Sequence, residues 1–493
     1  MLRAVRQIAQ KLTALTTVFC VFLCSVVSGA YGSRVSAPQA SQTGASAQES
    51  CDHFAIDFPK LPKAGTGTAS DKILAADALA PCQEAARLTP SPHFTYLYGQ
   101  VLLAVQRYRD AFHQFKLGAD SGDSSSMNGV GLMYASGWGA SRSDTEAAAW
   151  FRKSADAGNT DGMGYLGYFY MEGGGVPQSD ADAAIWFSKA ADRGSLDGIN
   201  YLGMLCFKGR GYPQSDKKAL EWWRKSAAAG NAVAMIDLGY MYAYGRGVRQ
   251  SDADAAAWWR KAADAGNSDG MNKLASIYAG GRGVPQSDAD AAAWWRKAAD
   301  NGNSEAMDNL GYMYVNGRGV PQSDADAAAW FRKAADAGDA RGMYSLGVMY
   351  QNGHGVPQKD YREAAAWFRG ASDRNCDQAK INLGVLYQIG WGVPQDRRAA
   401  SRLFAEAAKS NDPDVAAHGK KLLSDLASDP GPWNRSSASA SNPILLLAVG
   451  LALIGAANTS PSASTNQSSH SGRCMSFAIG NFETAKTLEG CPF

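Results

Sequence analysis

The sequence predicts an all-α protein in which helix pairs of one size are stacked in an array. Tryptophan recurs every 36 residues from Trp150 to Trp330, and a glycine column follows the same rhythm from Gly131 onward. The stretch GRGVPQSDADAAAW occurs at residues 281–294 and again, unchanged, at 317–330. A period of this length is typical of supersecondary units that bury their apolar faces only against their neighbours.

The N-terminus has the pattern of a secretory signal. Three basic residues among the first eleven precede an apolar run over residues 12–27, and small residues follow that run. This order predicts a signal peptide over residues 1–30; an uncleaved signal anchor is the alternative. We expect the mature protein to be exported, either to the periplasm or outside the cell.

Residues 31–92 form the first region of the expected mature chain and start with a linker-like stretch at 31–50, rich in Ser, Ala and Gln. The region holds Cys51 and Cys82. We expect these two to form a disulfide, because exported proteins meet an oxidising compartment. The segment 93–118 predicts a degenerate helix pair that caps the N-terminal end of the array.

Eight repeats are predicted over residues 119–408, each with two helices. In the first helix, apolar residues such as Met163 and Leu166 recur at three- and four-residue spacings, which indicates one apolar face. The second helix opens on a capping-box pattern such as Ser179 with Asp182. It carries a Trp–Trp or Trp–Phe pair, which we assign to the core, and we expect the second aromatic of each pair to be the more exposed.

The sequence past the repeats predicts a closing helix at 409–428 and a linker at 429–443. The segment 444–457 has 14 uncharged, mostly apolar residues, fewer than the ~20 that a membrane-spanning helix needs. We expect it to dock on protein or to associate shallowly with a membrane. The polar tail, at 458–493, is expected to hold a second disulfide between Cys474 and Cys491.

The repeat can be written A-x-x-G-N/D-x-x-x-M-x-x-L-G-x-M-Y-x-x-G-x-G-V-P-Q-S-D-x-x-x-A-x-x-W-x-x-K-A-A, and it is clearest from Ala299 to Ala334. This pattern resembles the Sel1-like repeat of the tetratricopeptide-like α-solenoids. The resemblance implies a right-handed α/α superhelical solenoid of about eight 36-residue helix-pair repeats and, usually, a protein–protein adaptor or scaffold role. Some secreted members are penicillin-binding or β-lactamase-like and carry a disulfide in each repeat, a cysteine pattern that this chain lacks.

One position of the first helix varies while its neighbours are nearly constant. We call it the variable column, and we expect it to contact a partner on the concave face, because a fixed frame there presents changing side chains. Its candidate partner-binding residues are Tyr165, Tyr201, Asp237, Lys273, Asn309 and Ser345.

A second candidate set lies in the G-x-G loop between the two helices of a repeat. We call it the loop column; it consists of Arg210, Arg246, Arg282, Arg318 and His354. Stacking predicts a stripe of cations there, suited to an acidic protein or an anionic glycan. The alternative is that each arginine pairs with an aspartate of its own or an adjacent SDAD cap.

A further basic column near the ends of the second helices, which includes Arg260 and Lys261, is explained by the helix dipole alone. Cys206 and Cys376 lie in units five repeats apart, too distant to bridge one another within the array. We expect both to be buried or free thiols.

Other functional classes find little support in the sequence. The 48 basic and 46 acidic residues nearly balance, so no whole-chain charge favours nucleic acid. The six histidines make no metal spacing, and no nucleophile elbow or phosphate-cradling loop is present. The sequence therefore predicts a non-enzymatic protein-interaction scaffold of the bacterial cell envelope, with no cofactor and no metal. A β-lactamase-like or penicillin-binding protein and a glycan-binding module are the alternatives.

Overall fold

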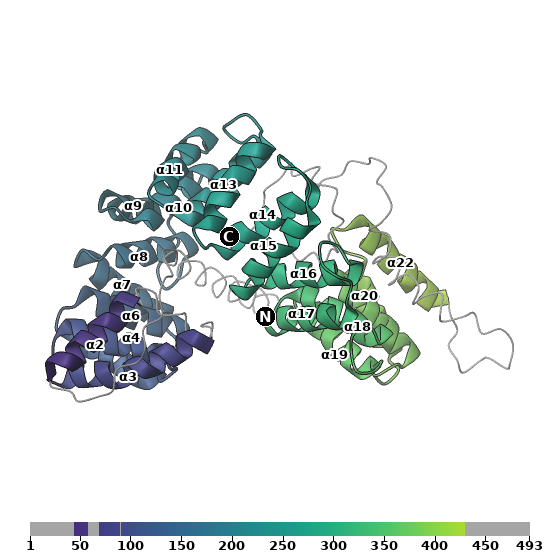
Figure 1. Ribbon diagram of the computed structural model, residues 1–493, viewed down its shortest axis with the longest axis horizontal. Helices are drawn as coiled ribbons and strands as arrows, with labels where there is room; N and C mark the ends of the chain where they lie inside the picture. Colours follow the sequence, from purple (N-terminus) through teal and green to yellow (C-terminus); the bar gives the residue numbers. More distant parts are fainter. Residues whose placement is uncertain (1–43, 58–68, 89, 429–493) are drawn as a thin grey trace. The chain divides into compact units, whose positions relative to one another are not determined.

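The structure, a computed structural model, describes residues 44–57, 69–88 and 90–428 (Figure 1). Every regular element in these ranges is a helix. None of the described helices is both long enough and apolar enough to cross a membrane. Four predicted features lie outside the described residues: the signal at 1–30, the linker at 429–443, the apolar segment at 444–457 and the tail with Cys474 and Cys491.

The chain divides into two units, Met1–Gln250 and Ser251–Phe493. Unit 1 contains α2 (Gly44–Asp57), α3 (Ala69–Leu88), α4 (Pro92–Ala104), α5 (Tyr108–Asp120), α6 (Ser124–Ser136), α7 (Asp144–Asp156), α8 (Thr160–Glu172), α9 (Asp180–Asp192), α10 (Leu196–Lys208), α11 (Asp216–Ala228) and α12 (Ala232–Tyr244). Unit 2 contains α13 (Asp252–Asp264), α14 (Ser268–Gly280), α15 (Asp288–Asp300), α16 (Ser304–Asn316), α17 (Asp324–Asp336), α18 (Ala340–Asn352), α19 (Tyr361–Asp373), α20 (Asp377–Ile389), α21 (Arg397–Ala407) and α22 (Pro413–Ser428).

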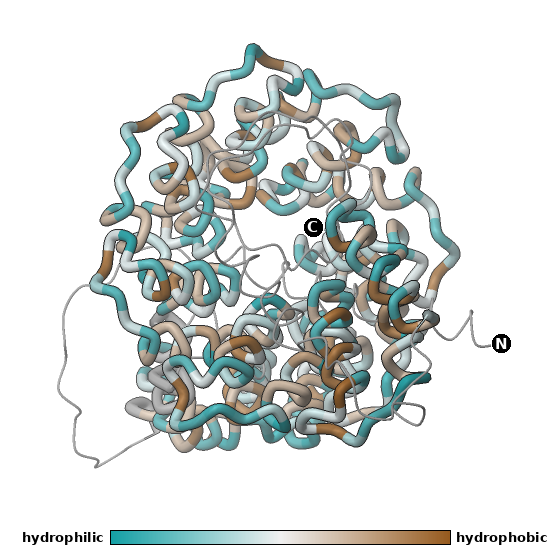
Figure 2. The backbone as a smooth tube through the Cα atoms, turned by 90° about the vertical axis from the view of Figure 1, so that its right-hand side faces the viewer, coloured by the Kyte–Doolittle hydropathy of each residue, from teal (hydrophilic) through white to brown (hydrophobic). Residues whose placement is uncertain are grey.

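Within each unit, every helix packs against the next one along the chain. The connections between helices are mostly hydrophilic, with isolated hydrophobic residues (Figure 2). The predicted all-α solenoid of helix-pair repeats is confirmed.

Local chemistry fixes the ends of both helices in a repeat. In α16, the Asn303 side chain accepts a hydrogen bond from the amide of Ala306 at 2.8 Å, and Gly317 ends the helix in the left-handed conformation, at φ 61°. In α17, Ser323 Oγ accepts from the amide of Asp326 at 3.2 Å. The Ser323 amide donates to the carbonyl of Tyr314 at 3.0 Å. The serine therefore caps its own helix and also ties it to the preceding one.

The aromatic pairs lie in the core, but the expected order of exposure is wrong. In α15, Trp295 is 3% exposed whereas Trp294 is half-buried. The glycine column explains why the second aromatic residue of each pair is the more deeply buried. A Cβ on Gly347 would lie 2.6 Å from Cε1 of Phe368, so the missing side chain leaves room for the ring of the second helix.

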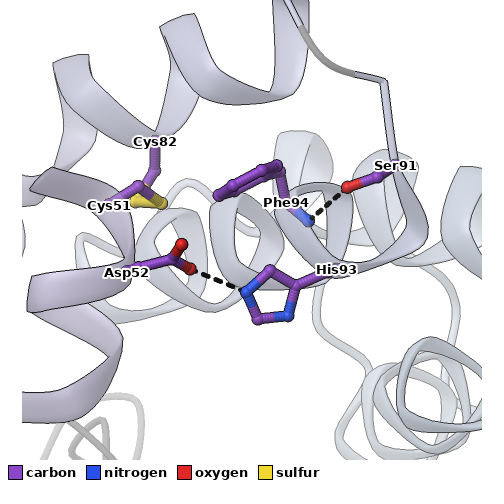
Figure 3. Close-up of a disulfide and its surroundings, with 6 residues drawn as sticks. All are labelled: Cys51, Asp52, Cys82, Ser91, His93 and Phe94. Carbon is purple, nitrogen blue, oxygen red and sulfur yellow. Dashed lines mark hydrogen bonds and ion pairs between the residues drawn. A yellow bond between two sulfur atoms is a disulfide. The ribbon is translucent and has the colours of Figure 1, made fainter. Parts of the chain in front are cut away.

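Two further helix pairs, α2–α3 and α4–α5, precede the eight repeats. The expected disulfide between Cys51 and Cys82 is present and joins α2 to α3 (Figure 3). In the same view, His93 of α4 lies 2.8 Å from a carboxylate oxygen of Asp52 of α2. The N-terminal pair is thus covalently closed and also contacts the pair that follows.

The other end of the described chain is closed by α22. Its apolar face, which includes Val415 and Leu422, is buried with Phe404 of α21. Lys420 and Lys421 lie exposed on the other side of the helix. A charged face of this kind prevents another repeat from docking there.

The two remaining described cysteines differ from one another. Cys206 is a buried free thiol, and burial raises its pKa. Cys376 is buried, as expected, but it is disulfide-bonded and so is not a free thiol.

Candidate partner-binding surfaces

The variable column lies largely inside the stack of repeats. Its members come from the middle of the first helices α8, α10, α12, α14, α16 and α18. Tyr201 and Lys273 are half-buried. The other four are between 4% and 6% exposed, namely Tyr165, Asp237, Asn309 and Ser345. Most of the column therefore contacts neighbouring repeats instead of presenting an open surface.

In unit 2 the column takes part in a series of hydrogen bonds between successive first helices. Asn309 Nδ2 donates to Asn272 Oδ1 at 3.2 Å, and Trp295 Nε1 donates to the same oxygen at 2.8 Å. One repeat further on, Ser345 Oγ donates to Asp308 Oδ1 at 3.1 Å. Both first-helix bonds join residues 37 positions apart, so each variable residue is matched to the residue that faces it in the preceding repeat.

A buried charge cluster surrounds the second of these bonds. Arg341 Nε lies 3.6 Å from Asp308 Oδ2, and the guanidinium also lies within 4.0 Å of Glu305 and Asp339. Asp308 is fully buried, and burial raises its pKa to about 7 against the opposing effect of Arg341. Ionisation of a group so placed costs free energy unless it remains paired.

In unit 1 the same column is largely aromatic. The ring of Tyr165 stacks on Phe151 with 4.9 Å between centroids, and that of Tyr201 stacks on Phe187 at 4.5 Å. Asp237 is the exception. Burial raises its pKa to about 8, and a side-chain hydrogen bond with Asn200 of the preceding repeat opposes the rise.

The loop column forms ion pairs between consecutive repeats, as the alternative interpretation of the sequence proposed. Arg246 donates from Nε and Nη2 to the two carboxylate oxygens of Asp216, at 2.6 and 2.9 Å. The corresponding pairs, each also 30 residues apart, are Arg210 with Asp180, Arg282 with Asp252 and Arg318 with Asp288. These four arginines are 24–30% exposed. An aspartate of the preceding repeat therefore neutralises each of these four arginines, whereas His354, the fifth member of the loop column, is exposed.

At two places an aromatic pair replaces the ion pair of this contact. Where the loop has Trp138 or Trp391, the aspartate position holds Tyr108 or Tyr361. The aromatic rings then contact each other: Tyr108 and Trp138 are stacked with centroids 5.6 Å apart, and Tyr361 and Trp391 are tilted with centroids 4.7 Å apart. The second glycine of the loop lets the loop lie close to the second helix of the preceding repeat. A Cβ on Gly247 would lie 2.9 Å from backbone atoms of Asp216. The sequence predicted aspartates of the SDAD caps as possible partners of the arginines, but it did not predict the aromatic partners Tyr108 and Tyr361.

The basic column near the ends of the second helices contacts aromatic rings, which the helix dipole alone does not explain. Arg296 donates to the hydroxyl of Tyr314, and its guanidinium carbon lies 5.3 Å from the ring centre of Trp330. Lys297 Nζ lies 4.1 Å from the ring centre of Trp294. Cation–π contacts of this geometry contribute about 0.5–1 kcal/mol each at exposed sites. The arginine thus joins its own repeat to the next one.

Helix pairs joined in this way, repeat upon repeat, define an α-solenoid. A family model described as the Sel1 repeat matches the chain eight times, at residues 124–159, 160–195, 196–231, 232–267, 268–303, 304–339, 340–376 and 377–412. The chain belongs to the Sel1 repeat family. Proteins of this family generally mediate protein–protein interactions and are generally non-enzymatic.

Several solved structures are similar to the chain. The protective antigen c5321 of uropathogenic Escherichia coli, which displays an SLR fold, is 26% identical, with a TM-score of 0.46 and coverage of 81% of this chain and 89% of that one. A Sel1 repeat protein from Oxalobacter formigenes is 31% identical, with a TM-score of 0.47 and coverage of 63% and 90%. The immunity protein Pa5087 of Pseudomonas aeruginosa is 18% identical, with a TM-score of 0.30 and coverage of 48% and 84%. No curated protein matches the chain.

Proposed function

We propose that the chain is an exported, non-enzymatic adaptor of the bacterial cell envelope, which binds a protein partner through the concave face lined by the first helices. The observation that carries this proposal is the bracing of each repeat against the next. The second glycine of the loop and the loop ion pairs recur in both units, and first-helix hydrogen bonds join successive repeats in unit 2. Such a frame presents a preformed surface, which lowers the entropy lost on binding.

Export is supported by the Cys51–Cys82 disulfide, since such bonds persist in oxidising compartments. The N-terminal sequence supports it independently. Expression of the full chain in a bacterial host, followed by mass spectrometry of the periplasmic fraction, should give a mature N-terminus near residue 31. An intact N-terminus in the cytoplasm would contradict export.

The binding face is tested by site-specific photo-cross-linking in envelope extract. We expect cross-linkers at Tyr201 and Lys273, the half-buried members of the variable column, to give discrete adducts with one protein. The matched controls are Ala257 and Ala293, which are exposed on the second helices. Adducts at the control positions alone would place the binding face elsewhere.

The two alternatives have less support. A penicillin-binding or β-lactamase-like activity predicts covalent labelling of the purified protein by fluorescent penicillin, and we expect none. A glycan-binding module needs open aromatic faces, yet Trp294 already has Lys297 and Arg260 over its ring. These cations occupy the surface on which a sugar would stack.

A further inference from the structure

Unit 2 has a continuous line of cations on its second helices, which we call the cation ridge. It consists of Arg260, Lys261, Arg296, Lys297, Arg332, Lys333 and Arg369. The lysines and two of the arginines are exposed, and the other two arginines are half-buried. The same contacts recur at each step. Arg332 lies 5.5 Å from the ring centre of Trp367, and Lys333 lies 3.8 Å from that of Trp330.

The ridge differs from the loop column in its charge balance. Each arginine of the loop column from Arg210 to Arg318 has an aspartate of the preceding repeat within 2.8 Å. Among the described residues, no carboxylate lies within 4 Å of any cation of the ridge. The aspartates that end these helices, Asp264, Asp300 and Asp336, are exposed and do not pair with it. Among the described residues, the ridge cations therefore form no ion pair of the kind that neutralises the loop column, and their charged groups stay available to a partner.

The ridge arginines are also held in one orientation. The guanidinium of Arg296 faces the rings of Tyr314 and Trp330, and one amino group donates to the tyrosine hydroxyl. A guanidinium has five N–H groups in a planar fork that matches a carboxylate. Because aromatic rings cover its face, the remaining donors point along its edge. This arrangement is preorganised for an acidic group that approaches from solvent.

We infer that the cation ridge of unit 2 binds an acidic segment of the protein partner. The Arg–Lys pair recurs at the same place in three successive repeats, so an extended acidic segment that follows the second helices meets one such pair in each repeat. The inference rests on the proposed function, because it takes the partner to be a protein, but it concerns a face different from the first-helix face.

Binding of poly-L-glutamate to the purified chain, measured by fluorescence anisotropy at several salt concentrations, tests the inference. The ridge variant K261Q/K297Q/K333Q should bind about tenfold more weakly, since each exposed charge pair contributes up to about 1 kcal/mol. The control variant K217Q/K420Q/K421Q makes the same change in net charge at exposed lysines away from the ridge, and it should bind within about twofold of the parent. Circular dichroism checks that both variants are folded.

Three outcomes would overturn the inference. Equal weakening by the two variants would show that net charge alone governs binding. Binding to heparin without binding to poly-L-glutamate would assign the ridge to an anionic glycan. Binding only to phosphatidylglycerol vesicles would assign it to a membrane surface. Each of these leaves the cross-linking result at Tyr201 and Lys273 unaffected, so failure of the ridge and failure of the proposed function are distinguishable.

Discussion

At the scale of single residues, the glycine column shows what a missing side chain contributes to a repeat. Gly347 lies in the interior of α18, where alanine has the higher helix propensity. The position nevertheless has no room for a methyl group, because the ring of Phe368 occupies that space. Packing therefore overrides propensity here.

We expect Gly347→Ala to lower the free energy of unfolding by about 1–3 kcal/mol, the usual cost of overpacking a core. Gly280→Ala is the matched control in the same unit. A Cβ there would meet only Arg282 Cγ, at 3.8 Å, so the change should be neutral or stabilise by about 0.5–1 kcal/mol. Urea denaturation of the three proteins measures both effects. Equal midpoints for the two variants would show that the ring is not seated on the glycine.

The buried carboxylates make stability depend on pH. Burial raises the pKa of Asp237 to about 8 and that of Asp308 to about 7, both from 3.8. A folded-state pKa raised above the unfolded value contributes stability that is fully present below about pH 4. That stability is lost as the pH rises to about 8.

The parent protein should therefore have a lower melting temperature at pH 9 than at pH 6. Each kcal/mol of stability lost between these two pH values should lower the melting temperature by roughly 2–4 °C. Asp237→Asn keeps the shape of the side chain and removes its charge, so it should reduce the difference between the two melting temperatures. The exposed Asp264→Asn is the control and should preserve that difference. An unchanged pH profile in Asp237→Asn would mean that the carboxyl is already ionised in the folded protein at pH 6, and hence that burial does not raise its pKa into this range.

At the scale of helices and loops, the loop contact occurs in two forms, an ion pair and a pair of aromatic rings. Asp216–Arg246 is a bidentate ion pair, whereas Tyr108–Trp138 brings two rings together at the equivalent place. The single variants Asp216→Tyr and Arg246→Trp each break a pair, and each should lower stability by about 0.5–1 kcal/mol, given the partial exposure of this ion pair.

The double variant D216Y/R246W should recover most of that loss, because it recreates the aromatic pair. Chemical denaturation of the four proteins gives the coupling free energy directly. Additive losses would show that the pair seen in other repeats depends on its surroundings.

The sequence predicted the elements well and their surfaces less well. Repeat length, helix ends and the core assignment of the aromatic pairs follow from spacing, because these features depend on residues within one repeat. The burial of Asn309 and Ser345 could not be predicted, because their hydrogen-bond partners lie 37 residues away in another repeat. The variability of that column suggested contact with a partner protein. Residues that are each matched to a different facing residue in the preceding repeat vary in the same way. A comparison of residues 30 and 37 positions apart is the signal that could have found both contacts.

At the scale of the whole molecule, the N-terminal disulfide closes a loop with a sequence separation of 31 residues. By the chain-entropy relation such a closure stabilises the folded state by about 3–4 kcal/mol. We expect C51S/C82S to lose hydrogen-exchange protection in α2 and α3 while the eight repeats keep theirs. Loss of protection throughout unit 1 would instead mean that the N-terminal pair is required for the repeats to fold.

The two kinds of contact between repeats constrain the history of the array in opposite ways. The loop side uses one interchangeable Asp–Arg pair from Asp180 to Arg318, so recombination between near-identical copies can add or remove a repeat without spoiling that joint. The first-helix side is individual: Asn272 faces Asn309, and Asp308 faces Ser345. A duplicated repeat would fit its new neighbours at the loop and mismatch them at the first helix. The loop contact therefore allows the number of repeats to change, whereas the first-helix contact fixes their order.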